Sequence, residues 1–287
     1  MQHSDYILSC DIGGSHITSA IVEAPTWRIL DETITRSPVN SLADAKSILQ
    51  DWLANMQSAI RKTDKAIQRI GVAAPGPFDY EQGIPLMQGQ SKYDALYQMQ
   101  ITDPILEGLP AKGCLQIRYI NDAAAFLQGE VFGGGLERQS TVLGITLGTG
   151  LGSAVWKQGE KAFDAALWNS PYRESIFEEY LVTRWLVKRF EELSGLRETG
   201  LKEILARHAD RDETETLLME YRTHLLQFLD FFSRKHQSQH FIIGGNIAKA
   251  WHRIFPDESA LAPYHVQVGK YQEHAAIIGA ASLFSDS

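Results

Sequence analysis

The sequence predicts a mixed α/β protein built from two related halves. Segments with strand-like hydrophobic patterns are followed by an amphipathic helix and a further strand, which is a β-β-β-α-β order common at the start of α/β layered domains. A glycine-rich turn between two strands occurs near residue 13 and again near residue 148, and such internal similarity indicates related halves. The chain has 287 residues and 44% apolar residues, enough for one large domain or two of ordinary size.

The first hairpin spans residues 7–22, with the sequence ILSCDIGGSHITSAIV. Gly13 and Gly14 can take positive φ and leave room for a ligand against the backbone. Successive N–H groups in such a turn can form a concave anion site, and Asp11 at the strand end can reach a phosphate-bound cation. The alternative is an ordinary β-hairpin in which Asp11 only stabilises the turn.

A third strand is expected over residues 27–35, followed by a helix that begins at Ser41 as its N-cap and runs to about residue 62. The next strand, residues 66–73, ends at Ala74-Pro75-Gly76-Pro77, where two prolines enforce an extended exit. The region 78–100 has no clean period and is expected to be a loop, either on the surface or carrying polar groups to a cleft.

A strand over residues 116–120 runs into Asn121-Asp122 and an alanine-rich helix over 123–131. A carboxylate at a strand end and at a helix N-terminus is well placed for a general base, because the helix favours its ionised form. The alternative role for Asp122 is that of a simple helix cap.

The second hairpin follows a strand over residues 141–146. The pattern Gly14-Ser15-x-Ile17-x-Ser19-Ala20-Ile21 matches Gly148-Thr149-x-Leu151-x-Ser153-Ala154-Val155 in register. Each half is therefore expected to contribute one phosphate-binding loop.

The remaining segments predict further helices and strands around a third glycine turn. Residues 159–175 are irregular, and helices are expected over 177–193 and 214–235, with aromatic stripes that face a core. A strand over 240–243 leads through Gly244-Gly245-Asn246 into a helix ending near residue 251, a turn that lets a flat ligand lie on bare backbone. A strand over 264–268 and a terminal helix over 273–284, rich in small residues, complete the chain.

Composition and charge restrict the kind of protein. The net charge of −8 disfavours nucleic acid as a partner, and no run of 18 apolar residues predicts a membrane span. No secretory signal is visible at the N-terminus, and two cysteines, Cys10 and Cys114, cannot form a disulfide framework or a four-cysteine zinc site. These features together predict a cytoplasmic protein.

The chain resembles the ROK family, which holds bacterial sugar kinases and related repressors within the actin-like, hexokinase-like ATPase superfamily. The resemblance covers nearly the whole chain, and its motifs occur in the family's order. They are Asp11-Ile-Gly-Gly-Ser, Ala74-Pro75-Gly76-Pro77, Asn121-Asp122 with Gly129-Glu130, Thr146-Leu-Gly-Thr-Gly-Leu-Gly, Ile243-Gly-Gly-Asn and Ile278-Gly-Ala-Ala.

The resemblance implies two actin-like, ribonuclease H-like domains, residues 1–121 and 122–287, with the terminal helix expected to pack back on the first. It implies ATP with Mg²⁺ in a cleft and a small-molecule sugar between the domains. Asp11 would act on the metal and the phosphates, and Asp122 would accept the proton of the attacking sugar hydroxyl. The expected nucleotide-binding residues are Gly13, Gly14, Ser15, Gly148, Thr149, Gly150, Gly244, Gly245 and Asn246.

The expected sugar-binding residues are Asn121, Asp122, Gly76, Ser91 and Glu174. The last two are expected only as substitutes, with Asp164 as the alternative to Glu174, because the family's glutamate–x–glycine–histidine sugar motif and its cysteine-rich zinc loop are absent between residues 159 and 178. We therefore expect no zinc and a weaker or altered sugar specificity. Similarity to the family also implies a homodimer.

Three functions compete at this point. The first is an ATP-dependent sugar kinase acting on a hexose or amino-hexose, like a glucokinase. The second is a non-catalytic sugar sensor or regulator without a helix-turn-helix, since Asp11 comes too early in the sequence for one. The third is an actin-like ATPase that acts on a protein partner.

Overall fold

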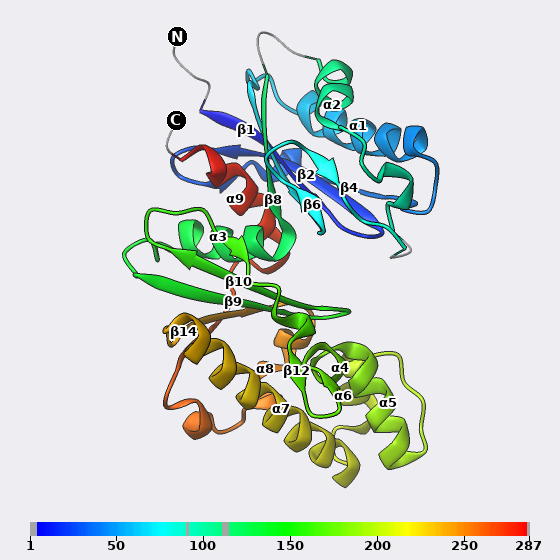
Figure 1. Cartoon of the computed structure of the whole chain (residues 1–287), viewed down its shortest axis with the longest axis vertical. Helices are drawn as coiled ribbons and strands as arrows, with labels where there is room; N and C mark the ends of the chain where they lie inside the picture. The colour runs from blue at the N-terminus through cyan, green and yellow to red at the C-terminus, as the bar shows by residue number, and fades with distance from the viewer. Residues whose placement is uncertain (1–4, 90–91, 111–114, 286–287) are drawn as a thin grey trace. The chain divides into compact units, whose positions relative to one another are not determined.

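The structure is a computed structural model that describes residues 5–89, 92–110 and 115–285 (Figure 1). Ser91 and Cys114, both named above, lie outside these described residues. Backbone contacts divide the chain into two compact units, residues 1–138 with 273–287 and residues 139–272. Each unit pairs a sheet with helices, so the predicted α/β class is confirmed. The actin-like domain boundary between residues 121 and 122 stays a prediction.

The sheet of the first unit has the order β3-β2-β1-β5-β8, and β4 also pairs with β2. Strand β1 is antiparallel to β2 and parallel to β5, which is in turn parallel to β8. The strands are β1 (Tyr6–Ile12), β2 (His16–Glu23), β3 (Arg28–Ile29), β4 (Thr35–Pro38), β5 (Arg69–Ala74) and β8 (Gln116–Asn121).

Helices cover both faces of this sheet. Alternate β1 residues Leu8, Cys10 and Ile12 face the core that includes α1 (Ala45–Arg61). Ile7 faces the opposite side, where α9 (Ala275–Ala281) contributes Ile277. Helix α1 begins after Asp44, not Ser41, because the Asp44 carboxylate accepts the Ser47 backbone N–H at 3.1 Å and its hydroxyl at 2.7 Å. Helix α2 spans Thr102–Gly108.

The terminal helix α9 belongs to the first unit and packs on α3 (Asp122–Gly134) with almost no space between backbones. A Cβ on Gly129 would lie 1.8 Å from the Ala275 carbonyl oxygen, and one on Gly279 would lie 1.9 Å from that of Ala125. The Ser9 hydroxyl on β1 donates to the Ile277 carbonyl, which ties α9 to the sheet. The small residues of the sequence therefore permit this close packing.

The second unit has a five-stranded sheet in the order β11-β10-β9-β14-β15, with helices α4–α8 (Figure 1). Sheet residues such as Leu143 and Ile145 share a core with apolar residues of α5 and α7. The strands are β9 (Thr141–Leu147), β10 (Leu151–Lys157), β11 (Phe163–Asp164), β14 (His240–Gly244) and β15 (His265–Val268). The helices are α4 (Glu178–Leu181), α5 (Thr183–Ser194), α6 (Leu201–His208), α7 (Asp212–His236) and α8 (Trp251–Ile254).

Several predicted elements are broken into shorter ones. The strand expected over 27–35 is β3 and β4 separated by a 3-10 turn, Asp31–Thr33, because the Thr33 hydroxyl donates to the Leu30 carbonyl and accepts the Ile21 N–H. The irregular stretch 159–175 leads into a small hairpin of β12 (Pro171–Tyr172) and β13 (Ser175–Ile176). The loop expected over 78–100 contains the hairpin of β6 (Phe78–Asp79) and β7 (Ile84–Pro85).

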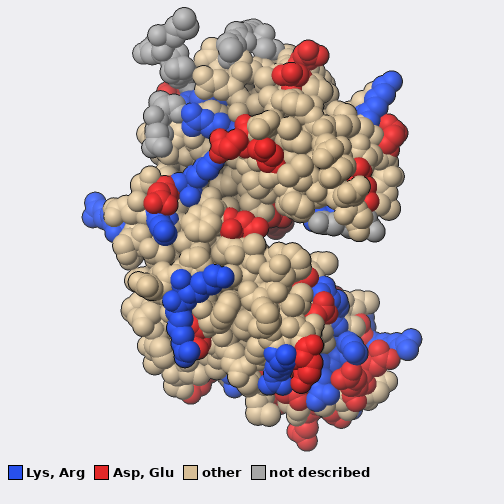
Figure 2. Space-filling view, in the orientation of Figure 1, with Lys and Arg blue, Asp and Glu red and all other residues tan. Residues whose placement is uncertain are grey.

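The surface charges over the helices of the second unit are interspersed rather than of one sign (Figure 2). Arg184 contacts both Glu178 and Glu179, and Arg189 contacts Glu192 and Glu220. Among the described residues, no helix has the length and hydrophobicity needed to cross a membrane.

Candidate active site

The turn between β1 and β2 leaves two successive backbone N–H groups without a protein acceptor. The Gly13 N–H donates to the His16 carbonyl at 2.8 Å, and the buried Tyr93 hydroxyl donates to the Gly13 carbonyl at 2.5 Å. The Val39 N–H holds the Ser15 carbonyl at 2.8 Å. Within the described part of the chain, no hydrogen bond uses the N–H of Gly14 or Ser15, so both can receive an anion.

The glycines of this turn do not use the positive φ that glycine can take; among the described residues the positive-φ glycines lie elsewhere, for example Gly83 and Gly245. A Cβ on Gly14 would meet no atom within 4 Å, and one on Gly13 would lie 3.4 Å from the His16 carbonyl oxygen. Neither backbone conformation nor the surrounding protein therefore requires glycine at position 14. The absence of a side chain keeps the outer surface of the turn open.

The turn between β9 and β10 has the same arrangement of donors but different supports. The Gly148 N–H donates to the Gly150 carbonyl at 3.2 Å, and both the N–H and hydroxyl of Thr183 donate to the Gly148 carbonyl at 2.8 and 3.0 Å. The Leu151 N–H donates to the Glu178 carboxylate at 3.0 Å. No acceptor among the described residues takes the N–H of Thr149 or Gly150, and a Cβ on Gly148 would again meet open space.

The third glycine turn follows β14, which is parallel to β9 and places Gly244 beside Thr146. Gly245 has φ +87°, and a Cβ there would lie 2.3 Å from the Leu147 carbonyl oxygen. Glycine is required at this position by both conformation and space. The close approach brings Asn246 to the same edge of the sheet as the second turn.

A cavity of about 870 Å³ in the second unit is lined by residues of both of these turns, Thr149 and Asn246. Another wall is formed by α6 and the preceding Gly200, a helix absent from the expectations above. The spacing of Leu201, Ile204 and Leu205 after a glycine was the available sequence signal. Its other lining residues are Thr183, Lys202, Glu203, Ala206, Ile247, Lys249, Ala250, His252 and Arg253.

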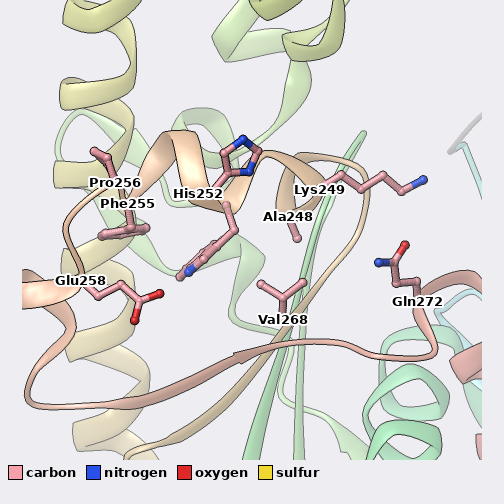
Figure 3. Close-up of a pocket in the computed structure, with 9 residues that line it drawn as sticks. Ala248, Lys249, His252, Phe255, Pro256, Glu258, Val268 and Gln272 are labelled. Atoms are coloured by element: carbon pink, nitrogen blue, oxygen red, sulfur yellow. The ribbon is translucent and has the colours of Figure 1, made fainter.

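A second cavity of about 560 Å³ in the second unit shares Lys249 and His252 with the first (Figure 3). Aromatic rings of Trp251 and Phe255 and the Val268 side chain line it, with Glu258 and Gln272 nearby. It contains none of the site residues expected from the sequence.

Asp11 and Asp122 form a pair of interacting carboxylates in the first unit. Burial raises the pKa of Asp11, the negative charge of Asp122 adds to the rise, and the positive charge of Arg36 opposes both effects, so that the pKa lies at about 7. Asp11 is half-buried near the end of β1, whereas Asp122 is exposed at the first turn of α3. Two adjacent carboxylates of this kind disfavour full ionisation unless a cation is bound.

Asn121, rather than Asp122, is the N-cap of α3. Its Oδ1 accepts the N–H groups of Ala123 and Ala124 at 2.9 and 3.1 Å, while Asp122 accepts the Ala123 N–H at 2.8 Å. The cap function considered for Asp122 thus belongs mainly to its neighbour. The exposed Asp122 carboxylate lies at a helix N-terminus that stabilises its charged form.

Gly76 and Asn121 come together around Tyr80, which the sequence did not single out. The Asn121 side-chain amide donates to the Tyr80 hydroxyl at 3.2 Å, and that hydroxyl donates to the Ala74 carbonyl at 3.2 Å. A Cβ on Gly76 would lie 3.2 Å from the same hydroxyl oxygen. An aromatic residue shortly after the Pro-Gly-Pro turn was the only signal for it.

Glu174 lies on the exposed β12–β13 hairpin of the second unit. Its carboxylate accepts the Tyr180 hydroxyl at 2.9 Å, which lowers its pKa. Asp164, the other carboxylate near the missing sugar motif, accepts the Ala166 N–H at 2.8 Å, and burial raises its pKa.

The oxygen atoms that could serve as metal ligands fit Mg²⁺. This ion takes oxygen ligands, and it usually retains several waters while using one or two carboxylates. Asp11 offers such a carboxylate, and its pKa is raised first by burial and then by the charge of Asp122, both of which a bound cation would oppose. Across the described ranges, no cluster of three or more His, Cys, Asp or Glu side chains suited to a metal is found.

The model of the ROK family matches residues 7–163, and the chain belongs to this family. A relative named N-acetyl-D-glucosamine kinase, from Haemophilus influenzae (strain 86-028NP), is 23% identical over 155 residues. That alignment covers 52% of this chain and 45% of the relative, so the chain matches about half the length of its curated relative.

Solved structures match almost the entire chain. A glucokinase from Parabacteroides distasonis has a TM-score of 0.76 at 18% identity, covering 99% of this chain and 98% of its own. A ROK family glucokinase from Streptomyces griseus, solved with glucose and AMPPNP, has a TM-score of 0.70 at 21% identity, covering 98% and 100%. These matches confirm the expected fold of two actin-like domains.

Proposed function

We propose that this protein transfers the terminal phosphate of ATP to a hydroxyl of a hexose or amino-hexose. The observation that carries the proposal is the pair of open glycine turns, each with two successive N–H groups that no described residue accepts, together with the carboxylate pair beside the first. Phosphoryl transfer depends mainly on positioning and charge stabilisation, and these are the groups it needs.

The N–H groups of Gly14 and Ser15 would bind one part of the triphosphate, and those of Thr149 and Gly150 another. The larger cavity of the second unit, which Asn246 lines, would hold the nucleoside. Gly244 and Gly245, which directly precede Asn246, would lie at the edge of the nucleoside site. Thr183 and Glu178 keep the second turn in the conformation that exposes its amides.

Asp122 would orient the attacking hydroxyl and accept its proton. Asp122 is exposed in the first turn of α3, where the helix dipole favours the negative charge that a base needs. A positioned base of this kind contributes roughly 10²–10⁴-fold to the rate. Asp11 would hold Mg²⁺, directly or through water, and a bound Mg²⁺ neutralises charge on the phosphates.

The sugar would be bound by Asn121 and by the backbone at Gly76. The Asn121 Oδ1 is occupied by the helix cap and one amide hydrogen by Tyr80, which leaves the second amide hydrogen for a sugar hydroxyl. Ser91 and Glu174 remain proposed additional contacts. Because the family's glutamate and histidine sugar motif is absent, we infer broad or altered specificity.

The test is a coupled assay of ADP release with ATP and Mg²⁺ over a panel of sugars. The panel includes glucose, mannose, fructose, N-acetylglucosamine and N-acetylmannosamine, since relatives carry names of both glucose and amino-sugar kinases. We expect sugar-dependent ADP release with at least one member. ADP release without any sugar dependence would instead favour an actin-like ATPase acting on a protein partner.

Sugar binding without turnover would favour a sensor or regulator, and a titration of each sugar by calorimetry separates that case from a true absence of substrate.

We also propose a cytoplasmic homodimer, as the family resemblance implies. Light scattering coupled to size-exclusion chromatography measures the oligomeric state directly, and a monomer over the working concentration range would refute the homodimer.

A further inference from the structure

Arg36 lies in the same row of the first sheet as Asp11. Asp11 on β1 pairs with Thr18 on β2, and Thr18 pairs in turn with Arg36 on β4. Side chains of directly paired residues lie on the same face of a sheet, and neighbouring strands are about 4.8 Å apart. Arg36 therefore begins roughly 10 Å from Asp11 and extends on the face where Asp11 lies.

This face is the one covered by α9. Alternate residues of the same strands, Ile7 on β1 and Ala20 and Val22 on β2, pack against Ile277 of α9. Arg36 lies beyond this apolar patch, at the end of the face where β1 finishes and α3 begins. The charge of Arg36 reaches Asp11, where it opposes the rise in pKa.

The ion pair that Arg36 makes in the structure is weak. Its guanidinium lies 3.7 Å from the Glu273 carboxylate, and the two side chains are 56% and 69% exposed. Exposed pairs of this kind contribute little to stability and exchange readily for a better partner. No other hydrogen bond or ion pair of the Arg36 side chain is found among the described residues.

We propose that Arg36 binds the terminal phosphate of the nucleotide, exchanging Glu273 for the phosphate oxygens. The inference rests on the proposed function, because a phosphate passed to a hydroxyl held by Asp122 must lie close to that carboxylate, on the first unit. Guanidinium groups bind phosphate with two parallel hydrogen bonds. Without such a group, a nearby pair of carboxylates repels the phosphate. Arg36 thus offsets the negative charge of Asp11 and Asp122 at the point where the phosphate arrives.

The test compares binding of AMPPNP and ADP, each with Mg²⁺, by calorimetry. Loss of one charge-assisted contact predicts that Arg36→Ala weakens AMPPNP about 10–100-fold while ADP changes less than about threefold. Arg36→Lys retains the charge and should recover part of the loss. The matched control is Glu273→Gln, which removes the competing partner and should leave AMPPNP affinity unchanged or slightly higher.

Equal losses for the two nucleotides, or no loss for either, in an Arg36→Ala variant with unchanged Tm would overturn the proposal. If the wild-type protein releases no ADP with any sugar but the variant still loses AMPPNP selectively, the phosphate role of Arg36 stands and the kinase function fails. If the wild-type protein binds neither nucleotide, both fail. Arg36→Gln serves as a second neutral variant and must repeat the selective loss.

Discussion

At the scale of single residues, Asp11 links stability to function. Its carboxyl is partly buried at the end of β1 and interacts with Asp122, so its pKa is raised from 3.8 to about 7. A carboxyl with a raised pKa stabilises the folded state fully below its unfolded pKa and loses that contribution as the pH rises through the folded value. The charge that nucleotide chemistry requires therefore destabilises the empty site at neutral pH.

We expect Asp11→Asn to be more stable than the wild-type protein at pH 8, by on the order of 2 kcal/mol, and this advantage to shrink progressively as the pH falls to 5 and to vanish only below the unfolded pKa of about 4. The amide has nearly the same shape but no charge to desolvate. Thermal unfolding of both proteins from pH 5 to pH 8 measures the difference. A pH-independent difference between the two would show that Asp11 is not titrating in this range.

Glycines at the three turns should respond differently to alanine. In Gly14→Ala or Gly148→Ala the new methyl group meets open space, so stability should change by less than about 0.5 kcal/mol while AMPPNP binding is lost. Gly245→Ala combines positive φ with a backbone clash at 2.3 Å and should cost about 2–4 kcal/mol. Urea unfolding and calorimetric titration on the same samples separate the two effects; retained binding in both open-turn variants would argue against phosphate at these turns.

At the scale of elements, the α3–α9 contact is fixed by glycine. Gly279→Ala would place a methyl group 1.9 Å from the Ala125 carbonyl and should destabilise the protein by more than about 3 kcal/mol, or prevent folding. Gly134→Ala is the matched control, because it lies near the C-terminal end of α3 where the nearest atom is 3.8 Å away. That change should be neutral or stabilising by up to about 1 kcal/mol. Similar unfolding midpoints for the two variants would contradict the close packing.

Element order was predictable because hydrophobic period and glycine turns are local signals. The limits of the elements depended on contacts that sequence spacing does not reveal. Ser41 is as good a capping residue as Asp44, and only the position of the Ser47 N–H distinguishes them. The strand expected over 27–35 is interrupted because the Thr33 hydroxyl accepts the N–H of Ile21 on β2, which lies twelve positions earlier in the chain.

At the scale of the whole molecule, the sequence indicated which turns repeat but not what supports them. Tyr93 and Thr183 hold the turn carbonyls from residues 80 and 35 positions away, and no local pattern connects such partners. The contacts of Tyr80 with Asn121 and Gly76 are apparent only in the structure, because these three residues are distant in the sequence or carry no shared pattern. The two halves therefore share a turn geometry with different supports, as expected when only the ligand-facing backbone is constrained by function.

The proposed sugar kinase activity is tested most directly by following ATP and sugar by ³¹P NMR, with Mg²⁺, in the wild-type protein and in Asp122→Asn. We expect a new sugar phosphate signal to grow together with ADP in the wild-type protein. In Asp122→Asn the rate should fall by roughly 10²–10⁴-fold with Tm and AMPPNP affinity unchanged. Undiminished sugar phosphate formation by the variant, or none by the wild-type protein with any sugar of the panel, would contradict the proposed function.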